Sequence, residues 1–200
     1  MRRGQRNDCR GGFQTRPYPA SGKRPRRRRL RLPDHDYASP GAYFVTICTH
    51  RRVCLFGQII NDTMRPNPFG EIVETCWQDL AVHYPNVRLD AFIIMPNHIH
   101  GILILEEPIR SAHGLTEIIR AFKTFSARRI NEKRGTSGLP LWQRGYYEHI
   151  ARNDAALDGI RAYIEANPAR WPYDKNNPQY TPPVGAGLKP APTNVVSRVE

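Results

Sequence analysis

Two apolar segments separated by a two-residue connection constrain the fold of this chain more than any other feature. The segments VRLDAFIIMP and HIHGILIL, residues 87–96 and 98–105, are rich in β-branched and aromatic residues, as strands are. Pro96-Asn97 is a turn signal, and such a short connection favours antiparallel pairing. The sequence therefore predicts an antiparallel sheet that contains this hairpin.

The remaining periodic segments predict helices and one further strand. Residues 42–49, AYFVTICT, suit a strand that is buried on both faces. Apolar residues recur at helical spacing in three segments, and Asn153 or Asp154 can cap the last of them. These helices are expected at residues 69–85, 114–135 and 155–167, whereas residues 139–152 are ambiguous. The order predicts an α+β fold, a small antiparallel sheet with helices on one face.

The two ends of the chain differ in composition from its middle. Residues 1–33 hold twelve of the 30 Lys and Arg residues and a single acid, Asp8, so most of the net charge of +12 lies there. We expect a disordered polycation that neutralises phosphates, although a solvated tail, residues upstream of the true start, or a transit peptide lacking an apolar face are alternatives. The predicted organisation is an arm at 1–36, a folded domain at 37–173, and a Pro/Gly-rich disordered tail at 174–200.

Cysteine usage and hydropathy indicate the compartment. Cys9, Cys48, Cys54 and Cys76 show no C-x-x-C spacing and no dense framework, which favours free thiols in a reducing environment. No segment approaches the roughly 20 apolar residues of a membrane span, and the N-terminus lacks the apolar core of a signal peptide. The sequence predicts a cytoplasmic protein with no membrane partner.

Two histidines at the start of a predicted strand are candidate metal ligands. Side chains two residues apart on a strand project to the same face, so His98 and His100 can converge on one ion while Ile99 points to the opposite layer. Neutral imidazoles suit divalent metals. The alternative is a pair of histidines that only hydrogen-bond at a sheet edge.

A tyrosine on the last predicted helix is the second candidate. Tyr163 and Asn167 are four residues apart and therefore share a helix face. The apolar stripe of this helix lies about a quarter-turn away from Tyr163. Tyr163 thus flanks the core, where it either serves chemistry or packs its ring and leaves the hydroxyl in water.

Four segments in a fixed order resemble a known family: MPNHIHGILIL, FKTFSARRIN, LWQRGYYEHIARN and YIEANP. The sequence is similar to the REP-associated tyrosine transposases, which belong to the HUH single-tyrosine transposases alongside the insertion sequence 200/605 group. The resemblance covers about residues 43–171. Together the four segments are much more specific than a His-x-His pair alone.

The resemblance implies a ferredoxin-like core and a metal-dependent endonuclease and strand transferase. His98 and His100 would hold Mg²⁺ or Mn²⁺, and Tyr163 would attack single-stranded DNA to form a covalent 5′-phosphotyrosine. In the insertion sequence group, a glutamine four residues after the tyrosine completes the metal site. Asn167 stands at this position here, one methylene shorter, and is the implied third ligand.

The resemblance also implies a DNA ligand, a palindromic repeat hairpin with a single-stranded flank. Tyr146 and Tyr147 are candidates for stacking on bases, although paired tyrosines are more often core residues. Both a monomer, in which the tyrosine acts in cis, and a homodimer are compatible with the sequence. The protein is expected to associate with the nucleoid. Six residues are candidates for contacts to DNA phosphates, where the alternative is ordinary solvated charge: Arg120, Lys123, Arg128, Arg144, His149 and Arg152.

Two other functions are compatible with the same residues. A single-stranded nucleic-acid-binding module without catalysis needs neither His98 nor Tyr163. In a metal-dependent hydrolytic nuclease, water attacks and Tyr163 only packs. Proteins with any of these three functions have basic patches, so net charge does not distinguish between them. The effect of metal chelation and the chemical nature of the product ends distinguish them. Within the transposase class, a domesticated protein acting on scattered chromosomal repeats is a further alternative.

Overall fold

The computed structural model describes residues 36–107 and 113–181. Nearly all of the predicted arm and most of the predicted tail lie outside these ranges. In chain order the elements are β1 (Gly41–Cys48), η1 (His50–Arg52), β2 (Gly57–Ile60), β3 (Thr63–Pro66), α1 (Pro68–His83), β4 (Val87–Met95), β5 (His98–Leu105), α2 (Leu115–Lys133), β6 (Tyr147–Ala151), α3 (Asp154–Glu165), α4 (Asn167–Arg170) and η2 (Trp171–Tyr173).

Four strands form the main antiparallel sheet, in the order β4-β5-β1-β6. With α1 between β1 and β4, and α2 between β5 and β6, the chain follows the β-α-β-β-α-β order of a ferredoxin-like fold. The predicted hairpin is confirmed: Met95 pairs with His98 across Pro96-Asn97. The ambiguous segment before residue 152 supplies the edge strand β6.

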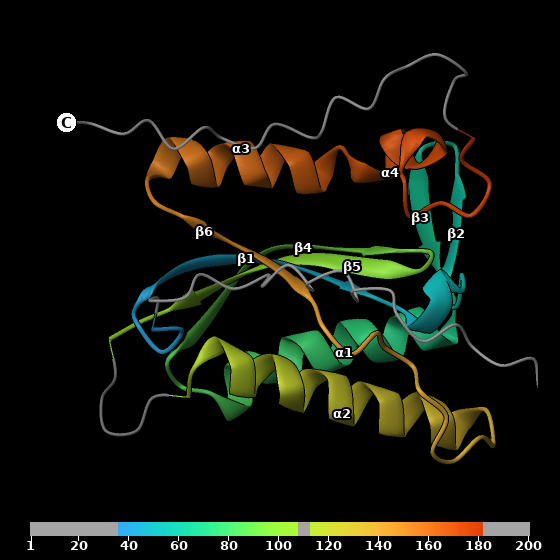
Figure 1. Cartoon of the computed structure of the whole chain (residues 1–200), viewed down its shortest axis with the longest axis horizontal. Helices are drawn as coiled ribbons and strands as arrows, with labels where there is room; N and C mark the ends of the chain where they lie inside the picture. The colour runs from blue at the N-terminus through green and yellow to red at the C-terminus, as the bar shows by residue number, and fades with distance from the viewer. Residues whose placement is uncertain (1–35, 108–112, 182–200) are drawn as a thin grey trace, which may run out of the picture.

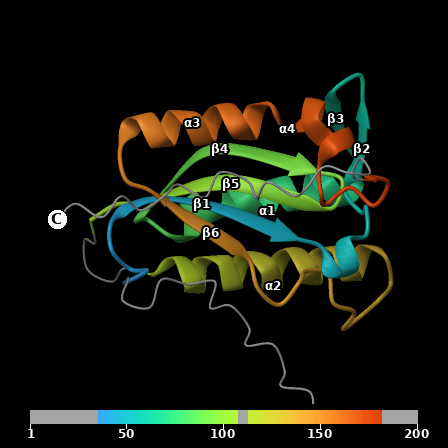
Figure 2. The same cartoon turned by 45° about the horizontal axis from the view of Figure 1, so that its top comes forward.

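Helices cover both faces of this sheet. Figure 1 shows α1 and α2 on one side and α3 on the other, and Figure 2 shows the same layers in a turned view. The expectation of helices on one face therefore holds for α1 and α2, and α3 departs from it. The reason is that the central strands are apolar on both faces: on the α3 side, Phe44 and Ile102 form a separate cluster with Ile164 of α3.

The larger core lies between the sheet and the pair α1 and α2. Its centre is Trp77 of α1, which is fully buried, stacks on Phe92 at 4.8 Å between ring centroids, and meets Phe122 edge-on at 5.4 Å. Gly101 of β5 lies directly beneath the Trp77 ring, where a Cβ atom would clash with it. The absence of a side chain at Gly101 thus lets α1 approach the strand that carries the histidines.

The hairpin β2–β3 was not predicted from the sequence. Its connection is Asn61-Asp62, and both residues have positive φ angles, 49° and 56°. Two residues in the left-handed region are what a tight type I′ turn requires, and Asn and Asp tolerate it better than most residues. The Asn-Asp pair after the short apolar run Ile59-Ile60 was the available signal.

Two further expectations concern thiols and membranes. Cys48, Cys54 and Cys76 are free, as predicted, and Cys9 lies outside the described residues. Among residues 36–107 and 113–181, every helix is too short or too polar to span a bilayer.

Candidate metal and tyrosine site

The two histidines at the start of β5 face α3, on the same side of the sheet as Phe44. Their Nε2 atoms lie 3.0 Å apart, and the rings are nearly perpendicular, at 80°. Both side chains are buried, with exposed fractions of 0% for His98 and 2% for His100. Ile99 between them belongs to the core on the opposite face, as the strand period predicted.

Asn97 fixes the orientation of His98. The Asn97 Nδ2 group donates to the carbonyls of Arg52 at 2.9 Å and Asn176 at 2.7 Å, so its Oδ1 atom is the end that faces His98. Oδ1 lies 2.8 Å from His98 Nδ1 and can only accept, which places the imidazole proton on Nδ1. The Nε2 lone pair of His98 therefore points toward His100.

The second histidine has a partner that permits either tautomer. His100 Nδ1 lies 2.9 Å from the Thr46 hydroxyl, which can donate or accept. Because His98 Nε2 accepts, His100 Nε2 donates to it in the structure as it stands. If Thr46 accepts instead, the His100 proton moves to Nδ1, and both Nε2 lone pairs face the same point.

Burial keeps both rings neutral. It lowers the pKa of His98, and the nearby Arg52 guanidinium lowers it further. Burial also lowers the pKa of His100, followed by the effect of His98, against smaller opposing effects of Asp174 and Asn167. Neutral imidazoles are the form that binds divalent cations.

Tyr163 of α3 stands over the histidines. Its ring centroid lies 5.3 Å from that of His100 and 5.9 Å from that of Phe44. The side chain is 41% exposed, so one edge of the ring packs while solvent or a ligand can reach the rest. Partial burial raises the pKa of the phenol, and a hydrogen bond with Asn167 opposes this rise.

Asn167 connects the tyrosine helix to the histidines. It begins α4 one turn after Tyr163, is 3% exposed, and donates from Nδ2 to the Tyr163 carbonyl at 2.7 Å. Its side chain also interacts with the His100 ring, which raises the pKa of His100, and with the phenol of Tyr163, which lowers the pKa of that group. The four predicted residues of the site thus lie together.

Asp174 lies beside the site although the sequence placed it in the tail. Its Oδ2 atom is 3.6 Å from His98 Nε2, and its side chain is only 12% exposed. The described chain continues to Thr181, past the expected boundary at 173, and Asn176 contributes the carbonyl that holds Asn97. The polar run DKNN after Trp171-Pro172-Tyr173 was a local signal for a structured segment.

The donor groups fit a small divalent cation. Two ligands placed side by side on an octahedral cation, at bond lengths of about 2.1 Å, lie about 3.0 Å apart, and the two Nε2 atoms have this spacing of 3.0 Å. No three His, Cys, Asp or Glu side chains form a closed cluster within the described ranges. If a divalent cation binds here, the imidazole pair would supply its nitrogen ligands and other groups would have to supply oxygen ligands, for which the Asn167 amide is the candidate.

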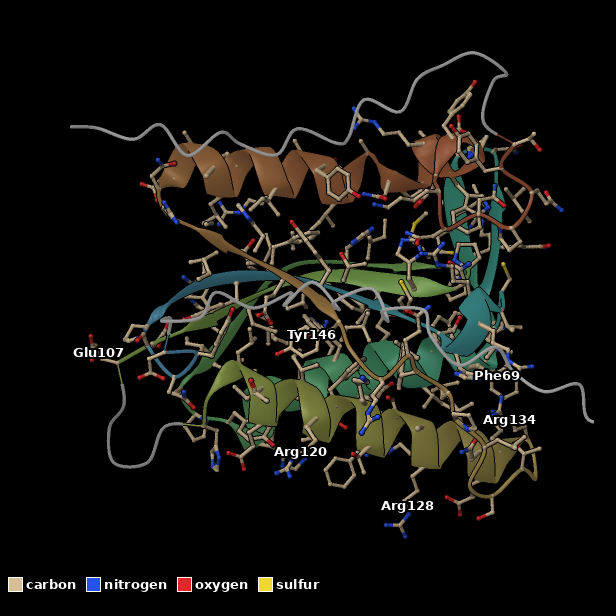
Figure 3. The ribbon with its side chains drawn as sticks, in the orientation of Figure 1. Phe69, Glu107, Arg120, Arg128, Arg134 and Tyr146 are labelled. Atoms are coloured by element: carbon tan, nitrogen blue, oxygen red, sulfur yellow. The ribbon has the colours of Figure 1, made fainter. Side chains whose placement is uncertain are left out.

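The candidates for DNA contacts do not form one surface. Arg120 and Arg128 are exposed on α2, on the opposite side of the sheet from Tyr163, and Figure 3 shows Arg128 pointing away from the protein body. His149 is exposed and pairs with Phe44, so its side chain lies on the histidine face. Arg152 is exposed between β6 and α3.

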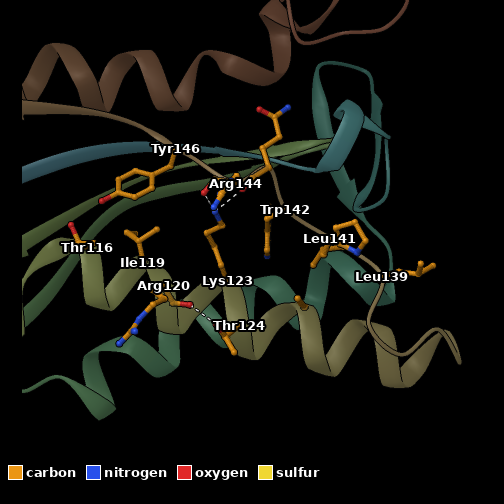
Figure 4. Close-up of a pocket in the computed structure, with 13 residues that line it drawn as sticks. Thr116, Ile119, Arg120, Lys123, Thr124, Leu139, Leu141, Trp142, Arg144 and Tyr146 are labelled. Atoms are coloured by element: carbon orange, nitrogen blue, oxygen red, sulfur yellow. Dashed lines mark hydrogen bonds between the residues drawn. The ribbon is translucent and has the colours of Figure 1, made fainter. Parts of the chain in front are cut away.

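Lys123 is engaged inside the protein. Its ammonium donates to the carbonyls of Gln143 at 2.6 Å and Arg144 at 3.1 Å, and more distantly to that of Gly145. These contacts hold the segment before β6 against α2, and burial lowers the pKa of the amine. A surface pocket of about 480 Å³ lies between α2 and the segment before β6 (Figure 4). Its lining includes Arg120, Lys123, Arg144 and Tyr146.

The ferredoxin-like sheet places its histidine pair beside a tyrosine on α3, the helix after the edge strand β6, as the resemblance to the HUH single-tyrosine transposases implies. Residues 41–167 match the family described as Transposase IS200 like, and the chain belongs to this family.

Two proteins of Haemophilus influenzae are similar in sequence. One, described as an uncharacterized protein, is 38% identical over 170 residues, covering 74% of this chain and 92% of its own. The other, named for the REP-associated tyrosine transposases, is 30% identical over 155 residues, covering 69% and 81%. A solved REP-associated tyrosine transposase bound to a REP hairpin has the same fold, with a TM-score of 0.52, 20% identity, and coverage of 70% of this chain and 74% of that one.

Proposed function

We propose that this protein cleaves and rejoins single-stranded DNA through a covalent bond to Tyr163. One observation carries the proposal: the Tyr163 ring lies 5.3 Å from the ring of His100, on the face of the sheet where the two imidazoles converge. A phenol beside a divalent-metal site is the arrangement needed for phosphoryl transfer to a tyrosine.

In the proposed reaction, the Tyr163 oxygen attacks the scissile phosphorus. A bond forms between this oxygen and phosphorus, and the bond between phosphorus and the 3′ oxygen breaks. The products are a 5′-phosphotyrosine and a DNA 3′-hydroxyl, which takes up a proton as the phenol loses one. Because the ester energy is conserved in the covalent intermediate, attack by another 3′-hydroxyl rejoins DNA without a nucleotide cofactor.

The residues around the phenol divide into two groups. Burial and the Asp174 carboxylate raise the pKa of Tyr163 and keep the resting phenol protonated. The Asn167 side chain and Arg170 favour the phenolate, so they stabilise the charge that develops during attack. His98, His100 and Asn167 would hold Mg²⁺ or Mn²⁺, which supplies Lewis-acid stabilisation of the phosphate charge when bound.

We further propose that the ligand is a repeat hairpin with a single-stranded flank, and that a monomer suffices. The hairpin follows from the solved relative, which is bound to one. The monomer is supported by the contact between Tyr163 and His100 within one chain. In this proposal the protein acts on chromosomal DNA in the cytoplasm. The proposed domain begins at residue 37 and extends beyond the expected limit of 173, to at least residue 177.

Two surfaces are proposed to contact the DNA. Tyr147, which is 52% exposed, and His149 lie on the histidine face at the edge strand β6, next to the phenol, and suit the single-stranded flank. Arg120 and Arg144 at the α2 pocket suit the phosphates of the hairpin, while Arg128 and Arg152 extend the basic surface.

The test is incubation with end-labelled hairpins and Mn²⁺, followed by denaturing electrophoresis and mapping of the modified residue. We expect a protein–DNA adduct on Tyr163 that is absent in Tyr163→Phe and present in Tyr173→Phe, a change at another exposed tyrosine. An undiminished adduct in Tyr163→Phe, or cleavage without any adduct, would overturn the proposal.

A further inference from the structure

The helix that carries Tyr163 is held on the sheet by few buried side chains. The structure describes all 12 residues of α3, and Ile164 alone among them is fully buried, where it packs on Phe44 and Ile102. The helix follows the edge strand β6 and runs beside β4, the strand at the opposite edge of the sheet (Figure 2). Contacts that fix the rotation of α3 on the sheet therefore decide where the phenol lies.

A bidentate ion pair joins α3 to β4. Arg161 donates from Nε to Asp90 Oδ1 at 2.9 Å and from Nη2 to Asp90 Oδ2 at 2.6 Å. The Asp90 side chain is only 11% exposed, and the hydrogen bond from Arg161 lowers the pKa of its carboxyl group. Two parallel hydrogen bonds between a guanidinium and a carboxylate fix the relative direction of the two groups as well as their distance.

The aspartate lies in an irregularity of β4 that directs its side chain. The register of β4 on β5 shifts between Leu89 and Phe92, where β4 has an extra residue. Such a β-bulge bends the strand, and bulges next to active sites redirect side chains. The Ala91 amide donates to Asp90 Oδ1 at 2.7 Å, so the backbone of the bulge orients the oxygen that Arg161 also contacts.

Arg161 and Tyr163 lie on opposite flanks of the apolar stripe of α3. At 100° per residue, Arg161 is about 70° from the centre of this stripe in one direction and Tyr163 about 90° in the other. Rotation of the helix about its axis therefore moves both side chains together. A rotation of about 10° moves an atom that lies about 6 Å from the axis by about 1 Å.

We propose that Arg161 and Asp90 are positioning residues for Tyr163. Their ion pair sets the rotation of α3 on the sheet, and so holds the Tyr163 ring centroid 5.3 Å from that of His100 and 5.9 Å from that of Phe44. Both residues act through the helix and not by contact with DNA. The inference rests on the proposed reaction of Tyr163 and adds to it the contact that orients the phenol.

The first test is the NMR spectrum of the full chain without DNA. The Tyr163 ring meets Phe44 edge-on, at 87° between ring planes, so its proton shifts depend on the placement of the two rings. Asp90→Asn keeps an oxygen that can accept from the backbone and removes the charge that Arg161 binds. We expect the Tyr163 ring shifts to change in Asp90→Asn and in Arg161→Gln. The matched control is Asp158→Asn, which removes the exposed partner of Arg161 within α3 and should leave these shifts unchanged.

The second test is the rate of adduct formation in a single turnover, at saturating hairpin and Mn²⁺ and at a temperature where every variant is folded. A misplacement of about 1 Å can reduce a rate about 100-fold. We expect Asp90→Asn and Arg161→Gln to be about 10- to 100-fold slower, with the Kd for the hairpin within about twofold. The double variant should be about as slow as either single variant, because both changes break the same pair. Loss of stability alone would leave the rate of the folded protein unchanged.

The two measurements separate this inference from the proposed function. Unchanged Tyr163 ring shifts in Asp90→Asn, or an unchanged rate of adduct formation, would refute the positioning role. If the natural protein forms no adduct on Tyr163, the proposed function fails, and the ring shifts still decide whether the ion pair orients the helix.

Discussion

The Nδ1 atom of His98 lies 2.8 Å from the Oδ1 atom of Asn97, and both donor hydrogens of that amide are committed to backbone carbonyls. The amide therefore cannot turn over to present its nitrogen to the ring. One carbonyl belongs to Arg52, whose φ of 57° lies in the left-handed region. Arg51 beside it also has a positive φ, 56°, so the turn whose carbonyl accepts from Asn97 has left-handed backbone at two consecutive residues.

Replacement of Asn97 by Ala should weaken metal binding by releasing the His98 tautomer. Loss of an outer-shell partner of a metal-binding histidine typically reduces affinity about 10- to 100-fold. We expect a rise of this size in the Kd for Mn²⁺. Nitrogen-15 shifts of the imidazole should show Nδ1 protonated in the natural protein and a mixture in Asn97→Ala. An unchanged mixture of tautomers in both proteins would remove Asn97 from this role.

Stability of the metal-free protein should fall as pH decreases below about 6.5, the ordinary pKa of histidine. The folded pKa values of His98 and His100 are lowered, so the unfolded chain binds more protons there and is favoured as pH falls. Each histidine contributes a slope of up to about 1.4 kcal/mol per pH unit. Urea unfolding at several pH values with a chelator measures it.

The control for this slope is a histidine double variant. The double change His98→Asn and His100→Asn should flatten the dependence of unfolding free energy on pH. Equal slopes in the natural protein and the double variant would mean that the buried imidazoles do not cause the acid sensitivity.

Gly101 and Gly159 should respond in opposite directions to replacement by Ala. At Gly101 the added methyl group meets the Trp77 ring, and overpacking of this kind costs about 1–3 kcal/mol. At Gly159, in α3, nothing lies within 4 Å of the added atom, and Ala is favoured in a helix by up to about 1 kcal/mol. Thermal or urea unfolding of the two variants decides; equal effects would contradict the packing described for Trp77.

Local patterns were sufficient to predict much of the fold. The β4–β5 hairpin follows from two apolar runs joined by Pro-Asn, and the period of a strand places His98 and His100 on one face. The capping residue Asn153 marks the start of α3, where its side chain accepts from the Ala156 amide. These features depend on residues that are neighbours in the sequence, so local sequence patterns are enough to predict them.

What the sequence did not predict depends on contacts between distant segments. The apolar stripe on α3 indicates which face of this helix is buried, but not which side of the sheet it packs on. The two apolar faces of β1 indicated that both sides of the sheet are covered. The meeting of Tyr163 with His100 came only from the family resemblance. The position of Asp174 beside the site was missed because no local pattern distinguishes a polar residue that packs against the site from one in a tail.

Arg144 and Lys123 should differ in how they affect DNA binding, although both line the α2 pocket. Arg144 is exposed and free to contact a phosphate, so Arg144→Gln should reduce the slope of log K against log salt by roughly 0.7–0.9. Lys123 already donates to the Gln143 and Arg144 carbonyls, and Lys123→Met should lower the unfolding free energy and leave the salt slope unchanged. Fluorescence anisotropy with a labelled hairpin at several salt concentrations measures the slopes. If Lys123→Met flattens the slope as much as Arg144→Gln does, the ammonium leaves its carbonyls to bind DNA, and the pocket opens on binding.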